Sequence, residues 1–363
     1  MSMYPVGMNK WELDTPSLCL DASALERNIA RMAAFLADKP VALRPHCKTH
    51  KCPTIAWKQL EAGAIGITCA KLGEAEVMAR AGIKDLLIAN QIVGPRKISR
   101  LVNLAAYTRV IVAVEDAQNV AALAAAAEAK GVRLRVIIEV DVGMGRCGVS
   151  HEQPVLDLAR QIVSLPALEF EGIMGYEGQM VFVEDFEERK KGAQEAMAKL
   201  IAARDLLVSH DIPVGIVSAA GTGTYEITAD YPGVTELQLG SYATMDARYA
   251  SVGIDYELAL SVVAQVISVT VPGQAIVDAG LKTLTPEFGM SRVIRPEGWE
   301  MTHLSEEHGF IECKGGEPLH LGDIVEIIPA HGCTTINLHD AYCVTRDDVV
   351  EAVWPIAARG CIR

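Results

Sequence analysis

One pattern constrains this fold more than any other feature of the sequence: a short apolar run followed by a longer amphipathic stretch, repeated eight times between about residue 20 and residue 250. Continuous apolar runs are typical of parallel strands buried on both faces, and amphipathic stretches are typical of the helices between them. Eight such units predict a (β/α)8 TIM barrel over residues 20–252. The predicted strands are 42–48, 65–70, 86–90, 109–114, 134–141, 170–176, 214–220 and 234–240.

A doubly wound open sheet is the competing interpretation, because it also alternates strands and helices. Such a sheet usually has a glycine-rich first turn. The first strand here ends instead in RPHCKTHK, and the sequence contains no strand–GxGxxG–helix unit. The barrel is therefore the favoured fold class.

The pattern changes after Tyr256, where apolar runs follow one another without long amphipathic stretches between them. Short strands separated by turns predict a second, mainly antiparallel β-domain over residues 253–363, and segment 1–19 is expected to add a strand to it. The connection 281–308 contains glycines and a proline and is predicted to be a loop. The predicted strands are 260–271, 274–280, 309–314, 323–331, 341–345 and 351–358.

The net charge of the 363-residue chain limits its partners. Lys and Arg number 33 and Asp and Glu number 46, so the formal net charge is −13. This acidic balance argues against a nucleic-acid-binding protein and against a polybasic membrane surface. No apolar stretch is long enough for a transmembrane helix, and the N-terminus lacks the pattern of a signal peptide. We therefore expect a cytoplasmic protein, in which nine cysteines without a C-x-x-C pair are free thiols.

The functional residues of a (β/α)8 barrel follow its strands, on the face formed by the βα loops. The first predicted strand ends at Lys48, where loss of solvent favours the neutral, nucleophilic form of an amine. Segments 221–224 and 240–242 follow the seventh and eighth strands, whose loops commonly bind phosphate in this fold. Together they predict a Schiff base with a phosphorylated aldehyde. The alternative for a strand-end lysine is a solvated side chain, which fits Lys51 better.

A second candidate site lies near the end of the chain, where His331 and Cys333 stand two positions apart in PAHGCTTINLHD. Imidazole and thiolate together suit zinc or another borderline divalent ion, and two protein ligands leave positions open for water and substrate. The alternative is a buried thiol beside a histidine in a turn.

Taken in order, these segments resemble a known family. RPHCK, GRCGV, GTGTY and the His-x-Cys pair occur with longer stretches such as LDTPSLCLDASALERNIARM and ELQLGSYATMDARY. The chain is similar to the metal-activated, pyridoxal-phosphate-dependent D-threonine aldolase and D-serine dehydratase family, which has the alanine racemase type of fold. The resemblance covers nearly the whole chain and implies a barrel followed by a β-domain, in agreement with the strand pattern.

Carried over by position, the resemblance implies a role for each candidate residue. Lys48 is the Schiff-base lysine, Arg146 lies beside the phenolic oxygen of the cofactor, and Tyr176 contacts the cofactor ring. His331 and Cys333 hold a divalent metal, which is Zn, Mn or Mg. The phosphate is held by Gly221, Thr222, Gly223, Gly240, Ser241 and Tyr242.

The implied activity is a lyase reaction on a β-hydroxy-D-amino acid, with a homodimer as the implied assembly. Retro-aldol cleavage of D-threonine or 3-hydroxy-D-aspartate would give glycine and an aldehyde. The alternatives are a dehydratase, which would give a 2-oxo acid and ammonia, and an amino-acid racemase or epimerase. A non-enzymatic carrier of pyridoxal phosphate is a further alternative, but the His331–Cys333 pair argues against it.

Two departures from the family pattern leave the reaction open. Cys333 matches the dehydratases, whereas typical aldolases have aspartate at that position. Phe182 stands six positions after Tyr176, where aldolases usually have a histidine that serves as acid and base. Either the reaction differs or another base is used, with Glu177, water on the metal, and His303 and His308 in the 281–308 connection as the candidates.

Overall fold

The computed structural model describes residues 5–363, and these residues form two compact units. Among the described residues, unit 1 comprises 5–31, 49–54 and 241–360, and unit 2 comprises 32–48, 55–240 and 361–363. The sequence-based boundary at residue 252 stays a prediction, because compact packing does not test whether a segment folds independently.

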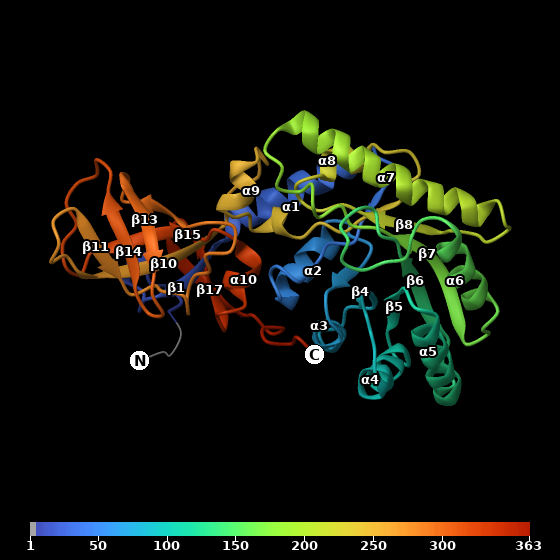
Figure 1. The fold of residues 1–363 in the computed structure, drawn as a ribbon. Coiled ribbons are helices and arrows are strands. Elements are labelled where there is room, and N and C mark those ends of the chain that lie inside the picture. Colours follow the sequence, from blue (N-terminus) through green and yellow to red (C-terminus); the bar gives the residue numbers. More distant parts are fainter. Residues whose placement is uncertain (1–4) are drawn as a thin grey trace. The chain divides into compact units, whose positions relative to one another are not determined.

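Unit 2 is built on eight parallel strands in the order β2-β9-β8-β7-β6-β5-β4-β3 (Figure 1). A parallel bridge between His46 and Thr68 joins the segment after β2 to β3 and so links the two edges of the sheet. This confirms the predicted (β/α)8 barrel, whose strands all fall within or next to the predicted apolar runs. The strands are β2 (Ala42–Leu43), β3 (Ile67–Cys69), β4 (Asp85–Gln91), β5 (Arg109–Val114), β6 (Leu134–Glu139), β7 (Leu168–Met174), β8 (Ile216–Ala219) and β9 (Glu236–Leu237).

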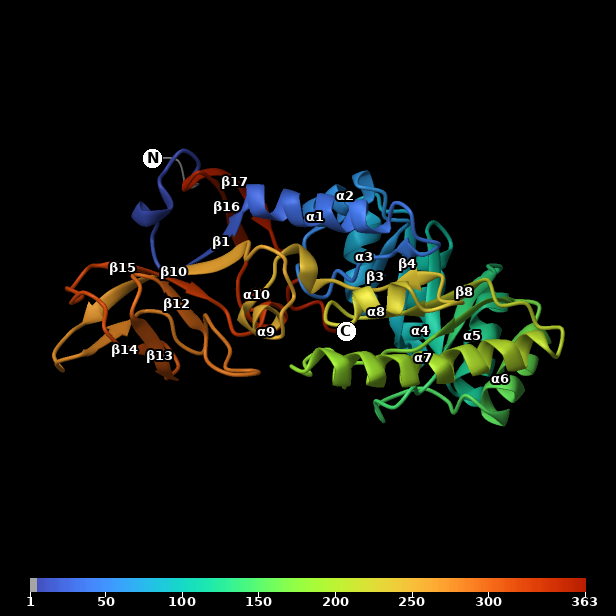
Figure 2. The same cartoon turned by 90° about the horizontal axis from the view of Figure 1, so that it is seen from above.

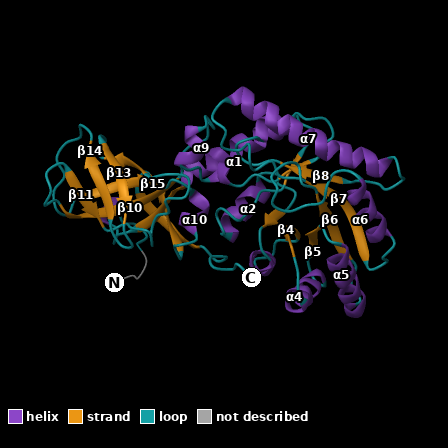
Figure 3. Ribbon diagram, viewed as in Figure 1, coloured by secondary structure: helices purple, strands orange, loops and turns teal. Residues whose placement is uncertain are grey.

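Helices follow these strands and cover the outside of the parallel sheet (Figures 2 and 3). Their ends follow from sequence: Asp116 caps α5 by accepting from the Asn119 amide, and Gly131 ends that helix with a left-handed φ of 70°. The helices of unit 2 are α3 (Leu72–Arg80), α4 (Pro95–Ala105), α5 (Ala117–Lys130), α6 (Gln153–Val163), α7 (Phe186–Val208) and α8 (Tyr225–Ala229), while α1 (Ala22–Leu36) and α2 (Pro53–Glu61) begin in unit 1 and end in unit 2.

The interior of the barrel is filled by apolar side chains from neighbouring strands. Leu87, Ile111, Ala113, Ile137 and Met174 form one buried cluster across β4, β5, β6 and β7. Burial of these apolar side chains is the main favourable contribution to the folding of unit 2. The polar residues that can carry chemistry lie at the ends of the strands.

Unit 1 is a mainly antiparallel sheet in the order β13-β14-β11-β10-β1-β16-β17, with β15 pairing β10 and β12. The N-terminal strand β1 pairs β10 antiparallel and β16 parallel, as expected for the segment before the barrel; residues 1–4 of that segment lie outside the described residues. The strands are β1 (Ser17–Asp21), β10 (Leu260–Ser268), β11 (Gln274–Val277), β12 (Arg292–Arg295), β13 (Trp299–Leu304), β14 (Gly309–Cys313), β15 (Ile324–Ile328), β16 (Ala341–Arg346) and β17 (Val349–Pro355).

The predicted loop 281–308 is wrong in part, because it contains strands β12 and β13. Both are stabilised by tertiary pairing, β12 with β15 and β13 with β14. The remaining helical elements of unit 1 are short: η1 (Lys10–Glu12), η2 (Ser241–Ala243), α9 (Ala247–Ser251) and α10 (Gly332–Ile336). Within residues 5–363 we find no helix whose length and apolar character would allow it to cross a membrane.

Candidate active site

Three of the predicted cofactor residues converge at the strand ends of unit 2. The Lys48 Nζ lies 5.5 Å from the centre of the Tyr176 ring, and the Arg146 guanidinium carbon lies 5.6 Å from the same centre. The backbone next to Lys48 is held by a hydrogen bond from the Cys47 amide to the Thr68 carbonyl oxygen, at 2.8 Å. An amine, an aromatic ring and a guanidinium therefore meet at one place, as the sequence predicts for a cofactor site.

The loop that carries Arg146 is organised by Asp141, directly after β6. Its Oδ1 accepts hydrogen bonds from the amides of Gly143, at 2.9 Å, and Gly145, at 3.1 Å. The donation from Gly143 is the main cause that lowers the pKa of Asp141, so the carboxylate stays ionised and the turn stays closed. Arg146 itself is half-exposed at the end of this turn.

Glu139, at the end of β6, lies behind Arg146. Its Oε1 is 3.9 Å from Nη2 of Arg146, and its Oε2 accepts from Gln91 Nε2 at 2.5 Å. Burial raises the pKa of Glu139, while the hydrogen bond from Gln91 and the charge of Arg146 oppose that rise. Glu139 thus places a buried carboxylate near the Arg146 guanidinium, and sequence reasoning did not single out this residue.

The glycines of the 221–224 loop are required by close packing. A Cβ at Gly223 would lie 2.0 Å from the carbonyl oxygen of Val181, and a Cβ at Gly221 would lie 3.1 Å from Cε2 of Tyr176. At Gly223 the contact is with backbone, so only glycine is tolerated there, whereas a side chain at Gly221 would require its neighbours to move by a few tenths of an ångström. The loop therefore lies against the Tyr176 ring, and its backbone is not shielded by side chains at these two positions.

Glu177 is a structural support of this loop, which corrects the suggestion that it is the missing base. It is 0% exposed, and its carboxylate accepts from Thr224 Oγ1 at 2.7 Å, Thr228 Oγ1 at 2.9 Å and the Ala220 amide at 3.3 Å. Complete burial raises the pKa of Glu177, and the bonds from Thr224 and Thr228 oppose that rise. A carboxylate enclosed in this way cannot reach a substrate proton.

Replacement of Glu177 by alanine is expected to destabilise unit 2 by ~3 kcal/mol, because two hydroxyls and one amide would lose their buried acceptor. The 221–224 loop should loosen, and the affinity for pyridoxal phosphate should fall with it. Urea denaturation and cofactor titration would measure both effects. The exposed Glu184, on the same connection, provides the matched control as Glu184→Ala. Equal stability of the two variants would contradict this role.

The second candidate site lies wholly in unit 1. The Cys333 Sγ is 3.1 Å from Thr49 Oγ1 and 4.0 Å from Ser241 Oγ, and these two hydroxyls lie 3.4 Å apart. His331 stands immediately before α10, and Cys333 lies in its first turn. The structure thus surrounds the thiol of the predicted metal pair with two hydroxyl groups. Ser241, which the sequence assigned to the phosphate, is one of them.

A buried carboxylate that the sequence did not single out contacts His331. The Asp246 Oδ2 is 2.9 Å from His331 Nδ1 and also 2.9 Å from the Gly332 amide. Burial alone would lower the pKa of His331, but the Cys333 thiolate and Asp246 outweigh it and raise that pKa to about 10. A metal ion must therefore displace a proton from the ring to bind there.

Among residues 5–363, no group of three or more His, Cys, Asp or Glu is arranged to hold a metal ion. None of the nine cysteines, which all lie within the described residues, forms a disulfide, although the buried sulfurs of Cys47 and Cys69 lie only 3.6 Å apart. Lys51 is 7% exposed, so its interpretation as a solvated lysine is wrong.

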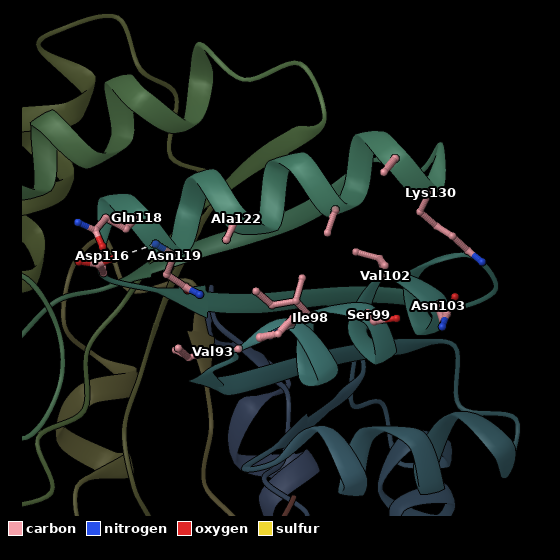
Figure 4. A pocket seen from close by; sticks show the side chains of 14 residues that line it. Val93, Ile98, Ser99, Val102, Asn103, Asp116, Gln118, Asn119, Ala122 and Lys130 are labelled. Atoms are coloured by element: carbon pink, nitrogen blue, oxygen red, sulfur yellow. Dashed lines mark hydrogen bonds between the residues drawn. The ribbon is translucent and has the colours of Figure 1, made fainter.

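Unit 2 also contains a cavity of about 750 Å³ between α4 and α5 (Figure 4). Its walls are mainly aliphatic, with Ile98 and Val102 on α4 facing Ala122 of α5. The charged groups, Asp116 and Lys130, lie at its opposite ends. The cavity is on the outer helices and contains none of the predicted site residues, so we do not assign the chemistry to it.

Comparisons with known families cover both units. Residues 20–248 match the family described as "Alanine racemase, N-terminal domain", and residues 259–345 match a serine dehydratase domain family. A D-threonine aldolase of Arthrobacter sp is 40% identical over 97% of this chain and 94% of that protein. A 3-hydroxy-D-aspartate aldolase of Paracoccus denitrificans is 39% identical over 98% of this chain and 94% of that protein.

Solved structures give the same relationship. The crystal structure of D-threonine aldolase from Filomicrobium marinum is 37% identical, has a TM-score of 0.95 and covers 99% of this chain and 100% of that one. D-threo-3-hydroxyaspartate dehydratase from Delftia sp. is 28% identical, with a TM-score of 0.88 over 96% of this chain and 98% of that one. A cysteine-to-alanine mutant of that dehydratase is described as being in the metal-free form.

Proposed function

The chain belongs to the alanine racemase N-terminal domain family, in the group of D-threonine and 3-hydroxy-D-aspartate aldolases, and from this premise we propose that it is a pyridoxal-phosphate- and metal-dependent lyase of β-hydroxy-D-amino acids. The observation that carries the proposal is the convergence of Lys48 and Arg146 on the Tyr176 ring in a chain 40% identical to an aldolase. The family resemblance expected from the motifs is confirmed.

The residues of unit 2 fit pyridoxal phosphate. Lys48 would hold the cofactor covalently, Tyr176 would lie against its ring, and Arg146 would neutralise its phenolic oxygen. Gly221 and Gly223 leave their backbone amides unshielded by side chains of their own, which favours a phosphate, and we assign Thr222 and Gly240 of the same unit to this anion. When bound, the cofactor supplies an electron sink for the charge left at the α-carbon.

The residues of unit 1 fit a divalent metal. His331 and Cys333 are a nitrogen and a sulfur donor, a set that favours zinc over magnesium or manganese. When bound, the metal supplies a Lewis acid that polarises the β-hydroxyl of the substrate. Support comes from the dehydratase of Delftia sp., whose cysteine mutant is described as metal-free. In the sequence Lys48 directly precedes Thr49, whose hydroxyl lies 3.1 Å from Cys333 Sγ.

The proton acceptor decides which bond breaks. Removal of the hydroxyl proton breaks the bond between Cα and Cβ, whereas removal of the α-proton by the Lys48 Nζ leads to loss of the hydroxyl or to racemisation. Glu177 is enclosed and Phe182 has no proton to exchange, so neither serves as the acceptor. Of the bases considered from the sequence, water at the metal pair remains for the aldolase course, together with His303 and His308, which are both exposed.

The identities favour an aldolase. The two aldolases are 40% and 39% identical to this chain, and the dehydratase of Delftia sp. is 29% identical. The dehydratase remains the second candidate for one reason, the thiolate at position 333. A homodimer and a cytoplasmic location remain predictions from the sequence.

Product analysis distinguishes these candidates. We expect the cofactor-loaded chain to convert D-threonine or 3-hydroxy-D-aspartate into glycine and an aldehyde, and to lose this activity in the presence of a chelator. A panel of D-amino acids would be incubated with and without chelator, and the products separated by chromatography. A 2-oxo acid with ammonia would select the dehydratase. Appearance of the enantiomer, with α-proton exchange and no chelator effect, would select a racemase and contradict the lyase.

A further inference from the structure

A histidine can bind a metal through either ring nitrogen, and the partner of one nitrogen decides which of them is available to the metal. In unit 1, His331 is only 8% exposed, and its Nδ1 contacts Asp246 at 2.9 Å. The ring orientation of the proposed metal ligand is therefore coupled to this carboxylate.

The hydrogen bonds around Asp246 fix the direction of the contact. Its Oδ2 accepts from the Gly332 amide at 2.9 Å, and its Oδ1 accepts from the Tyr249 amide at 2.9 Å. Backbone amides can only donate, so both oxygens of the carboxylate are acceptors. A carboxyl group is a stronger acid than a protonated imidazole, so His331 Nδ1 carries the proton of the shared hydrogen bond, which leaves Nε2 as the nitrogen that can bind a metal.

Burial distinguishes Asp246 from other aspartates with the same local role. Asp116 and Asp185 also stand before helices and accept from a backbone amide, but both are exposed, where a carboxylate is readily solvated. Asp246 is 0% exposed, and a buried carboxylate is costly unless its partners require the charge. The five-residue helix α9 would be capped as well by asparagine or serine.

We propose that Asp246 is a positioning residue that orients His331 Nε2 toward the metal and fixes the peptide between the two ligands. The role rests on the metal site of the proposed function. Asp246 does not bind the metal itself, since its oxygens are occupied by Nδ1 and by two amides. The Phe288 ring, whose centre lies 5.2 Å from the His331 ring centre at an interplanar angle of 87°, contacts the same ring.

The test compares Asp246→Asn and Asp246→Ser with Asp116→Asn, all as full chains loaded with pyridoxal phosphate. Asparagine and serine keep the helix cap but remove the carboxylate that accepts from Nδ1. The zinc Kd would be measured by competition with a chromophoric chelator, and the absorption spectrum with Co²⁺ in place of zinc would report the ligand geometry. We expect both Asp246 variants to raise the zinc Kd by about 10–100-fold and Asp116→Asn to leave it unchanged.

The outcomes separate this role from the metal site. If Asp246→Asn binds zinc within twofold of the wild type and gives the same cobalt spectrum, the residue is only a helix cap and the proposal is overturned. If the wild type and His331→Ala bind zinc equally, the metal site itself is wrong. Should the Asp246 variants not fold, the ¹⁵N shifts of His331 in the zinc-loaded wild type decide: a protonated Nδ1 supports the role, and a protonated Nε2 overturns it.

Discussion

Replacement of Lys48 by alanine is expected to abolish turnover, with a loss of about 10⁴-fold or more in kcat, because this amine is the proposed covalent attachment point of the cofactor. Its Nζ faces the Tyr176 ring at 5.5 Å, and the backbone before it is tied to Thr68. The variant should keep its fold, since the methylene groups of a half-buried side chain contribute little to the core. The measurement is kcat on the amino acid that the product analysis identifies.

A readout other than activity makes the Lys48 test specific. Added pyridoxal phosphate should raise the Tm of the wild type by mass action and raise that of Lys48→Ala much less. Lys84→Ala is the matched control, because Lys84 is exposed in the same unit, at the start of β4 rather than at its end. Full activity of Lys48→Ala with retained cofactor would remove the basis of the proposed function.

The barrel is predictable from the sequence because its signal is local. A strand such as β5, Arg-Val-Ile-Val-Ala-Val, is buried along almost its whole length and reads as one apolar run. Strand ends of parallel strands meet at one face, so Lys48 and Tyr176 could be assigned to one site before any contact was known. The prediction from sequence was least accurate for the 281–308 connection, which contains β13. In this strand Trp299, Met301 and Leu304 are buried, and the polar residues between them are exposed. That near-alternation was the available signal for a strand.

The parts that the sequence did not reveal depend on contacts between distant positions. Asp246 reads locally as a helix cap, and its partner His331 lies 85 positions further along the chain. Glu177 is adjacent to Tyr176 and so looks catalytic, but the hydroxyls that enclose it come from Thr224 and Thr228, 47 and 51 positions away. No local pattern distinguishes a buried, fully bonded carboxylate from a reactive one.

The glycine-rich loop shows why a motif alone is ambiguous. Gly221 and Gly223 were read as a phosphate signal, and the structure gives a second reason for them in the Tyr176 ring and the Val181 carbonyl oxygen. The two reasons are compatible, because a loop packed against the proposed cofactor-contacting ring can also present its backbone amides to the proposed phosphate. The steric reason, however, would hold in a protein that binds no phosphate.

Removal of either proposed metal ligand is expected to reduce kcat by about 10³-fold, because the β-hydroxyl would lose its Lewis acid. His331→Ala and Cys333→Ala should each lower bound zinc from one equivalent per chain toward zero, measured by elemental analysis after dialysis. The cofactor absorbance should persist in both, since Lys48 and Tyr176 belong to unit 2 and the metal pair belongs to unit 1. If both variants lose zinc but keep the cofactor absorbance, the metal and the cofactor are held by different residues.

The identity of the second ligand should determine which metal is bound. Cys333→Asp exchanges a soft sulfur donor for a hard oxygen donor, so activity lost with zinc should return in part with manganese or magnesium. Cys313→Ser is the matched control, because Cys313 is also half-buried in unit 1 and its hydrogen bond to the Gly316 carbonyl oxygen survives in serine. If Cys333→Asp shows the same order of metals as the wild type, the thiolate does not bind the metal. Cys333 would then be a buried thiol beside Thr49, the interpretation that the sequence alone also allowed.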